Sequence, residues 1–383
     1  MNCKIGGDKL NYKRIGDYIS LVDERNAGHN VKNLLGLSIS KQFIPSVANI
    51  VGTDMENYKI IRRNQFACST MQVRRDKKMP VALLEEVDEA IISQAYPIFE
   101  VRDEKELLPE YLMMWFTRSE FDREACFHAV GGVRGSLEWE DFENLKLPIP
   151  HPDKQCEIVK EYNVIQNRIE LNQKLIQKLE ETAQAIYREW FVDGIDKENL
   201  PEGWRVGNLS DLATIIMGQS PEGETYNKDG NGMIFYQGRT DFGYRFPNIT
   251  TYTTQPKKKA LQNDILISVR APVGDLNIAV ENCAIGRGVG ALRSKLKCNS
   301  HLFYTLQNLK SHFDISDGEG TIFGSINKDE LHNMKVVYSE SKIKVFDKIV
   351  KPIDDCIKNY SIQNQKLTEL KELLLSKLAT IEN

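Results

Sequence analysis

Apolar residues recur at an alternating spacing of four and three positions in two long stretches, at about 153–192 and 342–381. Sustained over nearly five heptads, this pattern predicts two long helices with a coiled-coil seam. Each helix would be on the order of 60 Å long at about 1.5 Å per residue. The seam positions are Ile158, Tyr162, Ile165, Ile169, Asn172, Ile176, Leu179, Ala183, Ile186 and Trp190 in the first stretch, and Phe346, Val350, Ile353, Ile357, Tyr360, Asn364, Leu367, Lys371, Leu374, Leu378 and Ile381 in the second.

The two seams complement each other if the helices pair antiparallel. With Asn172 opposite Asn364, every seam position of one helix faces a seam position of the other. In this register Trp190 meets Phe346. A buried amide pair would set register and orientation at some cost in stability, although either asparagine can instead be a half-exposed seam residue. We expect antiparallel rods that hold two globular units at opposite ends, related by a pseudo-twofold axis.

Proline and glycine mark the limits of these helices. Pro201 and Gly203 should end the first helix and open the next unit. Pro352 lies inside the second stretch, where it should kink the helix or place its start nearby. The predicted domains are a first unit at 1–150, a central helix at 151–196, a second unit at 197–339 and a C-terminal helix at 340–383.

The chain also repeats itself at a period near half its length, which indicates a duplicated unit. The tetrapeptide Asn-Gln-Lys-Leu at 172–175 returns 192 positions later at 364–367. Before each helix, the segment 136–146 is echoed 189 positions on by 325–335. Further corresponding segments are 15–19 with 209–213, 64–66 with 263–265, and 81–99 with 278–292.

Each unit combines short strands and helices without regular βαβ alternation. Residues 265–269 form an apolar β run flanked by proline and glycine turns. Helical periodicity appears at 109–122 and again at 300–313. We therefore expect an α+β fold class, with two similar mixed α/β globular domains joined by two long antiparallel coiled-coil helices.

The composition is typical of a folded protein of the cytoplasm. Of the 383 residues, 41% are apolar and 27% are charged, which is ordinary for globular domains. No run approaches the ~18 apolar residues that span a membrane, and the start of the chain lacks an apolar signal core. The scattered cysteines favour reduced thiols over a disulfide framework or a zinc site. They are Cys3, Cys68, Cys126, Cys156, Cys283, Cys298 and Cys356.

Positive charge gathers in two runs, although the net charge is −4. The runs fall at corresponding places in the two repeats, which favours a shared binding role over a merely solvated surface. They are Lys59, Arg62, Arg63, Arg74, Arg75, Lys77 and Lys78 in the first repeat, and Arg239, Arg245, Lys257, Lys258, Lys259 and Arg270 in the second.

Sequence motifs for catalysis and cofactor binding are missing. There is neither an Asn-Pro-Pro-Tyr nor an Asp-Pro-Pro-Tyr tetrapeptide for amino-methyl transfer, and no phosphate-binding Gly-x₄-Gly-Lys-Ser/Thr loop. The run 286–290 (Gly-Arg-Gly-Val-Gly) imitates a dinucleotide loop without the third spaced glycine, so we interpret it as a turn between strands with Arg287 near phosphate. The histidines show no metal-like spacing. We expect neither a catalytic residue nor a metal site.

This organisation resembles the specificity subunit of type I restriction-modification systems over essentially the whole chain. The specific pieces are the helix 170–191, the sequence Pro-Glu-Gly-Trp at 201–204, and the segment 266–274 (Leu-Ile-Ser-Val-Arg-Ala-Pro-Val-Gly). The resemblance implies two target-recognition domains that each read half of a split double-stranded DNA sequence. It also implies helices that set the spacing and dock two methyltransferase subunits, with restriction subunits as possible further partners. S-adenosylmethionine, ATP and Mg would be bound by those partners.

Base reading needs Arg, Lys, Asn or Gln at a groove edge, and phosphate contact needs cations. The resemblance transfers no base-contact residue, because such recognition domains diverge. The aromatic residues that end the first helix can either cap the coiled coil or dock the methyltransferase subunit. The DNA-binding candidates are Arg62, Arg63, Arg74, Arg75, Lys77, Lys78, Gln219, Gln237, Arg239, Lys257, Lys258, Lys259, Arg270 and Arg287, and the coiled-coil or partner candidates are Asn172, Tyr187, Trp190, Phe191 and Asn364.

The favoured hypothesis is a non-catalytic DNA-recognition subunit. Its rods would hold the readers on half-sites roughly 34–36 Å apart, and one added helical turn would change this gap by about 5.4 Å. An enzyme with irregularly spaced nuclease or methyltransferase residues is a second possibility, and turnover by the purified chain alone would favour it. A protein-docking adaptor is a third, and it would tolerate alanine at 257–259.

Overall fold

The computed structural model describes residues 12–46, 55–71, 73–130, 135–196, 198–315 and 325–380. Cys3 and Ile381, named above, lie outside them. The chain divides into two compact units, Met1–Leu171 with Gln363–Asn383 (unit 1) and Asn172–Ile362 (unit 2). No described helix is both long and apolar enough to cross a membrane.

Unit 1 is built on an antiparallel sheet with the strand order β2-β9-β6-β7. Phe66 on β6 lies opposite Phe99 on β9, and their stacked rings have centroids 4.9 Å apart. Phe116 and Phe142 from the helices complete this aromatic core, so the sheet and helices bury one shared apolar face. The elements are β2 (Ile19–Val22), β6 (Phe66–Cys68), β7 (Val81–Leu83), β9 (Ile98–Val101), α2 (Pro109–Thr117), α3 (Ser119–His128) and α4 (Trp139–Asn144).

Smaller elements surround this sheet. The buried Lys41 attaches the β3–β4 hairpin to α3, with its Nζ 2.8 Å from the Asp122 carboxylate. The strands pair antiparallel as β1–β10, β3–β4 and β5–β8. Their bounds are β1 (Tyr12–Arg14), β3 (Leu35–Leu37), β4 (Phe43–Pro45), β5 (Lys59–Arg62), β8 (Glu89–Ile92) and β10 (Lys146–Pro148), and α1 spans Val73–Asp76.

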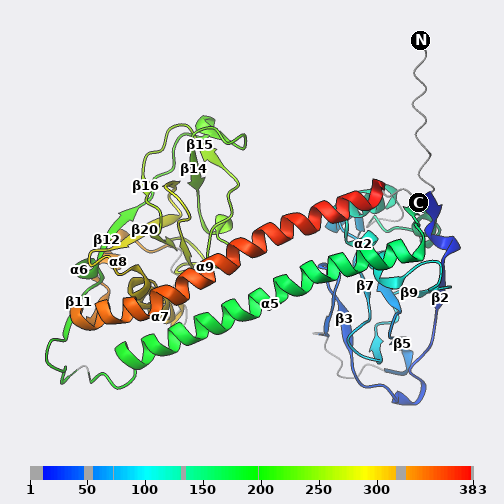
Figure 1. Ribbon diagram of the computed structural model, residues 1–383, viewed down its shortest axis with the longest axis horizontal. Helices are drawn as coiled ribbons and strands as arrows, with labels where there is room; N and C mark the ends of the chain where they lie inside the picture. The colour runs from blue at the N-terminus through cyan, green and yellow to red at the C-terminus, as the bar shows by residue number, and fades with distance from the viewer. Residues whose placement is uncertain are drawn as a thin grey trace, which may run out of the picture. The chain divides into compact units, whose positions relative to one another are not determined.

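Unit 2 repeats the same sheet, with the strand order β12-β20-β17-β18. Ile265 on β17 lies opposite Leu292 on β20, at the positions that the sequence matches to Phe66 and Phe99. The predicted duplication and the α+β fold class are therefore confirmed (Figure 1). The elements are β12 (Ala213–Met217), β17 (Ile265–Ser268), β18 (Leu276–Ile278), β20 (Val289–Ser294), β11 (Arg205–Asn208), β21 (Lys335–Tyr338), α6 (Leu209–Leu212), α7 (Asn299–Ile315) and α8 (Lys328–Asn333).

A second sheet of unit 2 has the order β13-β15-β14-β19-β16. Strands β14 and β19 pair parallel, whereas its other pairs are antiparallel. Its buried face carries Ile234, Tyr236, Cys283 and Ile285. The bounds are β13 (Tyr226–Asn227), β14 (Met233–Tyr236), β15 (Tyr252–Thr253), β16 (Lys259–Ala260) and β19 (Cys283–Ile285).

Two long helices, α5 (Pro152–Phe191) and α9 (Glu340–Lys377), each belong in part to unit 1 and in part to unit 2. The predicted domain boundaries separate the helices from the globular parts, whereas each compact unit includes a piece of both. Pro352 lies inside α9. The alternative that Pro352 marks the start of the helix is thus wrong, because α9 begins at Glu340 and continues through the proline.

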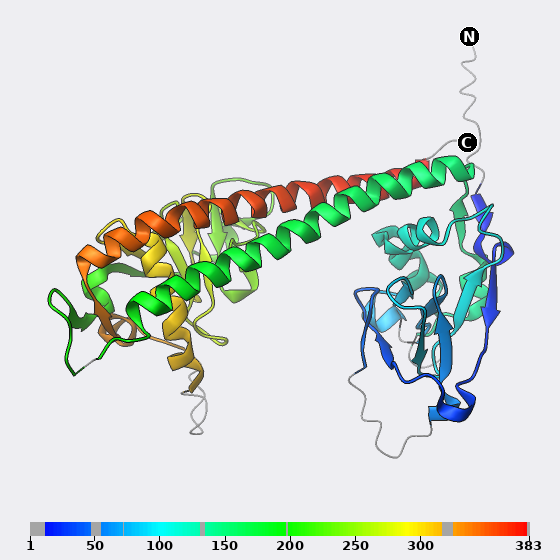
Figure 2. The ribbon, with the colours of Figure 1, turned by 60° about the horizontal axis from the view of Figure 1, so that its bottom comes forward.

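Within each unit the two helices run antiparallel in the predicted register (Figures 1 and 2). In unit 1, Lys371 donates to the Gln166 side chain at 3.0 Å. In unit 2, the rings of Trp190 and Phe346 meet with centroids 6.3 Å apart. Asn364 donates to the backbone carbonyl of Ile169 at 3.3 Å within unit 1.

Candidate nucleic-acid interface

Three loops of unit 2 meet at one end of its four-stranded sheet. The amide of Gly218 donates to the carbonyl of Val289 at 2.9 Å. The amide of Gly286 donates to the carbonyl of Tyr236 at 2.8 Å. These backbone bonds fix the loops to one another, and they confirm the predicted turn between strands. The loops are 218–220 after β12, 237–239 after β14, and 286–288 between β19 and β20.

Glycine allows the loops to approach this closely. A Cβ on Gly218 would lie 2.1 Å from the carbonyl oxygen of Gly286. A Cβ on Gly288 would lie 2.8 Å from the carbonyl oxygen of Gln237. Any side chain at these positions would push the loops apart.

Exposed polar side chains cover the joined loops. The amide of Val269 donates to the carbonyl of Gly288 at 3.0 Å, which adds the β17–β18 connection to the cluster. Amide and guanidinium groups of this kind read base edges and bind phosphates. We call four of these exposed side chains the loop surface of unit 2: Gln219, Gln237, Arg270 and Arg287. None of them forms a hydrogen bond or ion pair through its side chain within the described part of the chain.

The other predicted cations of unit 2 are partly committed to neighbouring acids. Arg239 is ion-paired with Asp275, which also binds Lys310. Lys257 lies 3.6 Å from Glu222. Lys258 directly precedes β16 and Lys259 is its first residue, and both side chains are exposed. These residues add positive charge near the loop surface, but the acids offset a part of it.

Arg245 does not belong to the exposed basic run in which the sequence places it. Its side chain is 1% exposed and lies between α5 and α9. The guanidinium is 2.6 Å from Glu180 on α5 and also bonds Asp354 on α9. Its carbon lies 4.2 Å from the ring centre of Phe303. Burial disfavours the charge, but the Asp354 and Glu180 carboxylates outweigh it and raise the Arg245 pKa. Charge counting could not distinguish this buried cation from a surface one.

In unit 1 four of the predicted cations, Arg74, Arg75, Lys77 and Lys78, lie on the β6–β7 connection, the counterpart of the β17–β18 connection. The amide of Leu137 donates to the Thr70 carbonyl at 2.9 Å, and that of Ile326 donates to the Val269 carbonyl at 2.9 Å. These matching bonds show that the two connections are equivalent, and each carries an exposed arginine, Arg74 in unit 1 and Arg270 in unit 2. Arg75 pairs with Asp76, whereas no side-chain hydrogen bond or ion pair within the described residues involves the exposed Arg74, Lys77 and Lys78.

Arg62 and Arg63 are bound to acids of their own unit. Arg62 lies 2.7 Å from Glu24 and 2.8 Å from Glu89. Arg63 lies 3.0 Å from Asp88. These pairs neutralise much of the charge on β5, so the β6–β7 connection is the more electropositive part of this unit.

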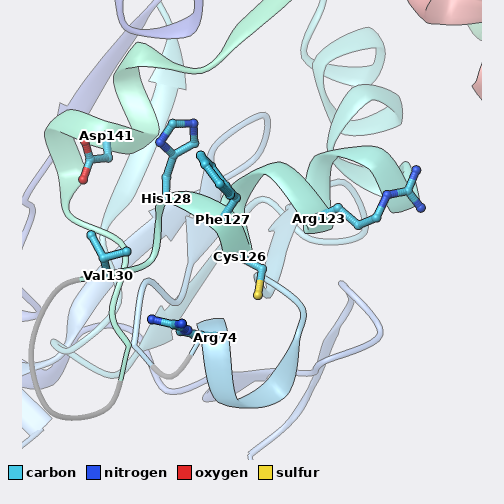
Figure 3. Close-up of a pocket in the computed structure, with 7 residues that line it drawn as sticks. All are labelled: Arg74, Arg123, Cys126, Phe127, His128, Val130 and Asp141. Atoms are coloured by element: carbon cyan, nitrogen blue, oxygen red, sulfur yellow. The ribbon is translucent and has the colours of Figure 1, made fainter.

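A hollow of about 630 Å³ adjoins the β6–β7 connection (Figure 3). Arg74 extends into it from α1, toward Val130. Phe127 and His128 reach it from the end of α3, with ring centroids 5.2 Å apart. Sequence reasoning missed this part of the surface, because an isolated phenylalanine is ordinarily buried. The lining residues are Arg74, Arg123, Cys126, Phe127, His128, Val130 and Asp141.

The aromatic end of α5 is packed inside unit 2. Tyr187 and Phe191 are each 5% exposed, and both rings contact Phe346 on α9. Trp190 is half-buried beside the same ring. Of the two roles left open by the sequence, the capping of the helix pair is the one that this packing supports. Asn172 is also buried, and its direct contact with Asn364 stays a prediction.

His301 is a buried titratable residue of unit 2 that packs against aromatic rings. His301 lies against Phe191 with ring centroids 4.6 Å apart, and burial lowers its pKa to about 3. It is therefore neutral at physiological pH. Among the described residues, no group of three or more His, Cys, Asp or Glu side chains is arranged to hold a metal ion, and the described cysteines are free thiols.

Comparison with known proteins places this architecture in a family. A family model described as the type I restriction modification DNA specificity domain matches residues 73–181 and 201–372. A protein of Methanocaldococcus jannaschii described as a type I restriction enzyme MjaX specificity subunit is 32% identical over 284 residues, which cover 70% of this chain and 66% of that protein. The type I restriction enzyme HindI specificity subunit of Haemophilus influenzae is 21% identical over 375 residues, covering 76% and 81%.

A solved structure shares the fold. The S subunit of a type I restriction-modification system from M. genitalium superposes with a TM-score of 0.63, covering 98% of each chain at 16% identity. The family model covers more than half of this chain, in two segments that follow the internal repeat. The chain therefore belongs to the family of type I restriction-modification DNA specificity subunits.

Proposed function

We propose that this chain reads a bipartite double-stranded DNA target, one half with each repeat, for a type I restriction-modification complex. The observation that carries the proposal is the equivalence of the two basic connections. Arg270 on the β17–β18 connection and Arg74 on the β6–β7 connection are exposed on connections that join equivalent strands of the duplicated sheets. A two-part reader needs equivalent surfaces that differ in their side chains, because shared backbone geometry sets the docking and the side chains choose the bases.

On the loop surface of unit 2, the two side-chain types suit different contacts. An amide such as Gln219 or Gln237 can bond an adenine through two atoms, and an arginine can do so with a guanine or contact phosphate. Each good base contact contributes about 1–3 kcal/mol of discrimination. Affinity falls as the salt concentration rises, and each phosphate contact makes the slope of log affinity against log salt more negative by about 0.9.

A matched pair of variants tests this assignment. Arg287 precedes β20 at the loop surface, whereas Lys297 follows the opposite end of that strand. The six residues of β20 separate them by about 20 Å at roughly 3.4 Å per residue. Arg287→Ala should weaken binding to the methylation-mapped target about tenfold, and Lys297→Ala should leave it unchanged. Equal effects of both variants in fluorescence anisotropy would contradict the proposed surface.

We also propose that this chain itself is not catalytic. Two methyltransferase subunits, joined in some assemblies by restriction subunits, would supply S-adenosylmethionine, ATP and Mg chemistry. Methylation or cleavage of target DNA should therefore require those subunits. Turnover by the purified chain with S-adenosylmethionine, magnesium and DNA would overturn this part of the proposal.

The long helices are proposed to set the gap between the half-sites. Each continues from one unit into the other, and a continuous helix lengthens by a fixed 1.5 Å or so per residue. Mapping the modified adenines in host DNA should return a split motif with a fixed gap. Deletion of this chain should erase the motif.

A further inference from the structure

A large apolar side chain is exposed in the hollow of unit 1. Phe127 is 78% exposed and the nearby Val130 is 70% exposed. Helix α3 turns Phe121 and Ala125 inward to the core, so its packing is complete without Phe127. An exposed phenylalanine of this kind adds no core packing, and exposed apolar groups framed by polar ones mark surfaces that bind a partner.

The charges around Phe127 favour a polyanionic partner. Two arginines, Arg74 and Arg123, line the hollow against the single carboxylate of Asp141, and the His128 imidazole adds a hydrogen-bonding group. Arg123 is 3.0 Å from Glu120 and points away from Phe127, so it contributes less. Arg74 belongs to the β6–β7 connection, and the hollow is therefore continuous with the proposed DNA-binding surface.

We propose that Phe127 is a wedge that packs between DNA bases when unit 1 binds its half-site, while Arg74 contacts the adjacent phosphate. This inference rests on the proposed function. Apolar wedges enter a base step from the groove, and the unstacking that they cause is offset by the buried ring and by the contacts that a bent duplex permits. Pyrimidine–purine steps unstack most readily. Unit 1 should therefore prefer such a step at the position that meets Phe127.

The test uses the full-length chain in complex with its methyltransferase partner and the methylation-mapped duplex. 2-Aminopurine replaces, one at a time, the adenines of the half-site that unit 1 reads, except the methylated adenine, because a methyltransferase itself flips its target base out of the stack. Binding of the unaltered complex should raise the fluorescence severalfold at one step, where the base loses its stacking. Phe127→Ala should abolish this rise and weaken binding about tenfold, whereas Phe127→Leu should keep most of both because leucine is also an apolar wedge.

Leu21→Ala is the matched control. Leu21 is 56% exposed on β2 of the same unit and does not line the hollow, so this variant should behave like the unaltered chain. If the complex binds its target but no 2-aminopurine responds, the wedge is refuted and DNA reading stands. If Phe127→Ala retains the signal but loses the methyltransferase subunit during purification, the hollow is a protein-docking site and the wedge is refuted. If the complex does not bind the target at all, both proposals fail.

Discussion

Replacement of Arg245 by methionine should destabilise unit 2 by several kcal/mol. The variant replaces the aliphatic stem of arginine with another unbranched apolar chain but removes the cation that holds Glu180 on α5 and Asp354 on α9. Those carboxylates are 19% and 15% exposed, so water can replace the guanidinium only in part. The loop before β15 would lose its attachment to both helices.

The magnitude follows from this burial. Removal of one partner from a buried ion pair costs about 3–5 kcal/mol, because the remaining charge is left without compensation. Here two carboxylates are left, but partial hydration lowers the cost of each, and we expect about 4 kcal/mol. The variant Arg245→Met with Glu180→Gln and Asp354→Asn removes the unpaired charges, so it should recover more than half of the loss.

Arg205 provides the matched control. It also lies over an aromatic ring, that of Tyr338 at 4.8 Å, and pairs with Glu340 at 2.6 Å. Its side chain is 60% exposed, however, and solvent screens an exposed pair so that it adds little to stability. Arg205→Met should therefore be nearly neutral.

Hydrogen exchange of peptides that cover 239–250 measures the local opening free energy without requiring that the whole chain unfold in one step. Arg245→Met should accelerate exchange there by two to three orders of magnitude, since about 1.4 kcal/mol corresponds to a factor of ten. A change below about 1 kcal/mol, or equal effects of Arg245→Met and Arg205→Met, would refute the claim that the buried cation holds this loop.

Three other predictions concern pH, loop approach and spacing. Burial holds the His301 pKa at about 3 in the folded chain, whereas the unfolded chain takes up this proton below about pH 6.5. As the pH is lowered from about 6.5 toward 3, the unfolding free energy should therefore decrease by up to ~1.4 kcal/mol per pH unit. His301→Gln should flatten that part of the profile in urea titrations, and an unchanged slope would contradict it. Gly218→Ala should weaken DNA binding at least tenfold while circular dichroism stays native, because its methyl would meet the Gly286 carbonyl. Insertion of one helical turn into both α5 and α9 should widen the methylated motif by one to two base pairs, about 5.4 Å, and an unchanged gap in methylation sequencing would exclude the helices as the spacer.

The periodic and repeated features of this protein could be predicted from its sequence. A seam of apolar residues spaced by three and four positions predicts a helix, because a helix places all of these side chains on one face, where they are buried together. The equivalence of the two sheets was visible in matched segments, and Asn64 and Asn263 share a positive φ of 65° and 68° at matching positions. Such features depend on spacing along the chain, which a sequence displays directly.

Whether each cation is buried or exposed was decided by the tertiary structure. Arg245 and Arg270 belong to the same basic run, yet one is buried between helices and the other is exposed. Phe127 is exposed although its residue type is ordinarily buried. A side chain's role depends on neighbours that are distant in sequence, such as the carboxylates of Glu180 and Asp354 around Arg245. Composition and local pattern determine which elements form, whereas the packing of those elements determines which cations remain available to bind DNA.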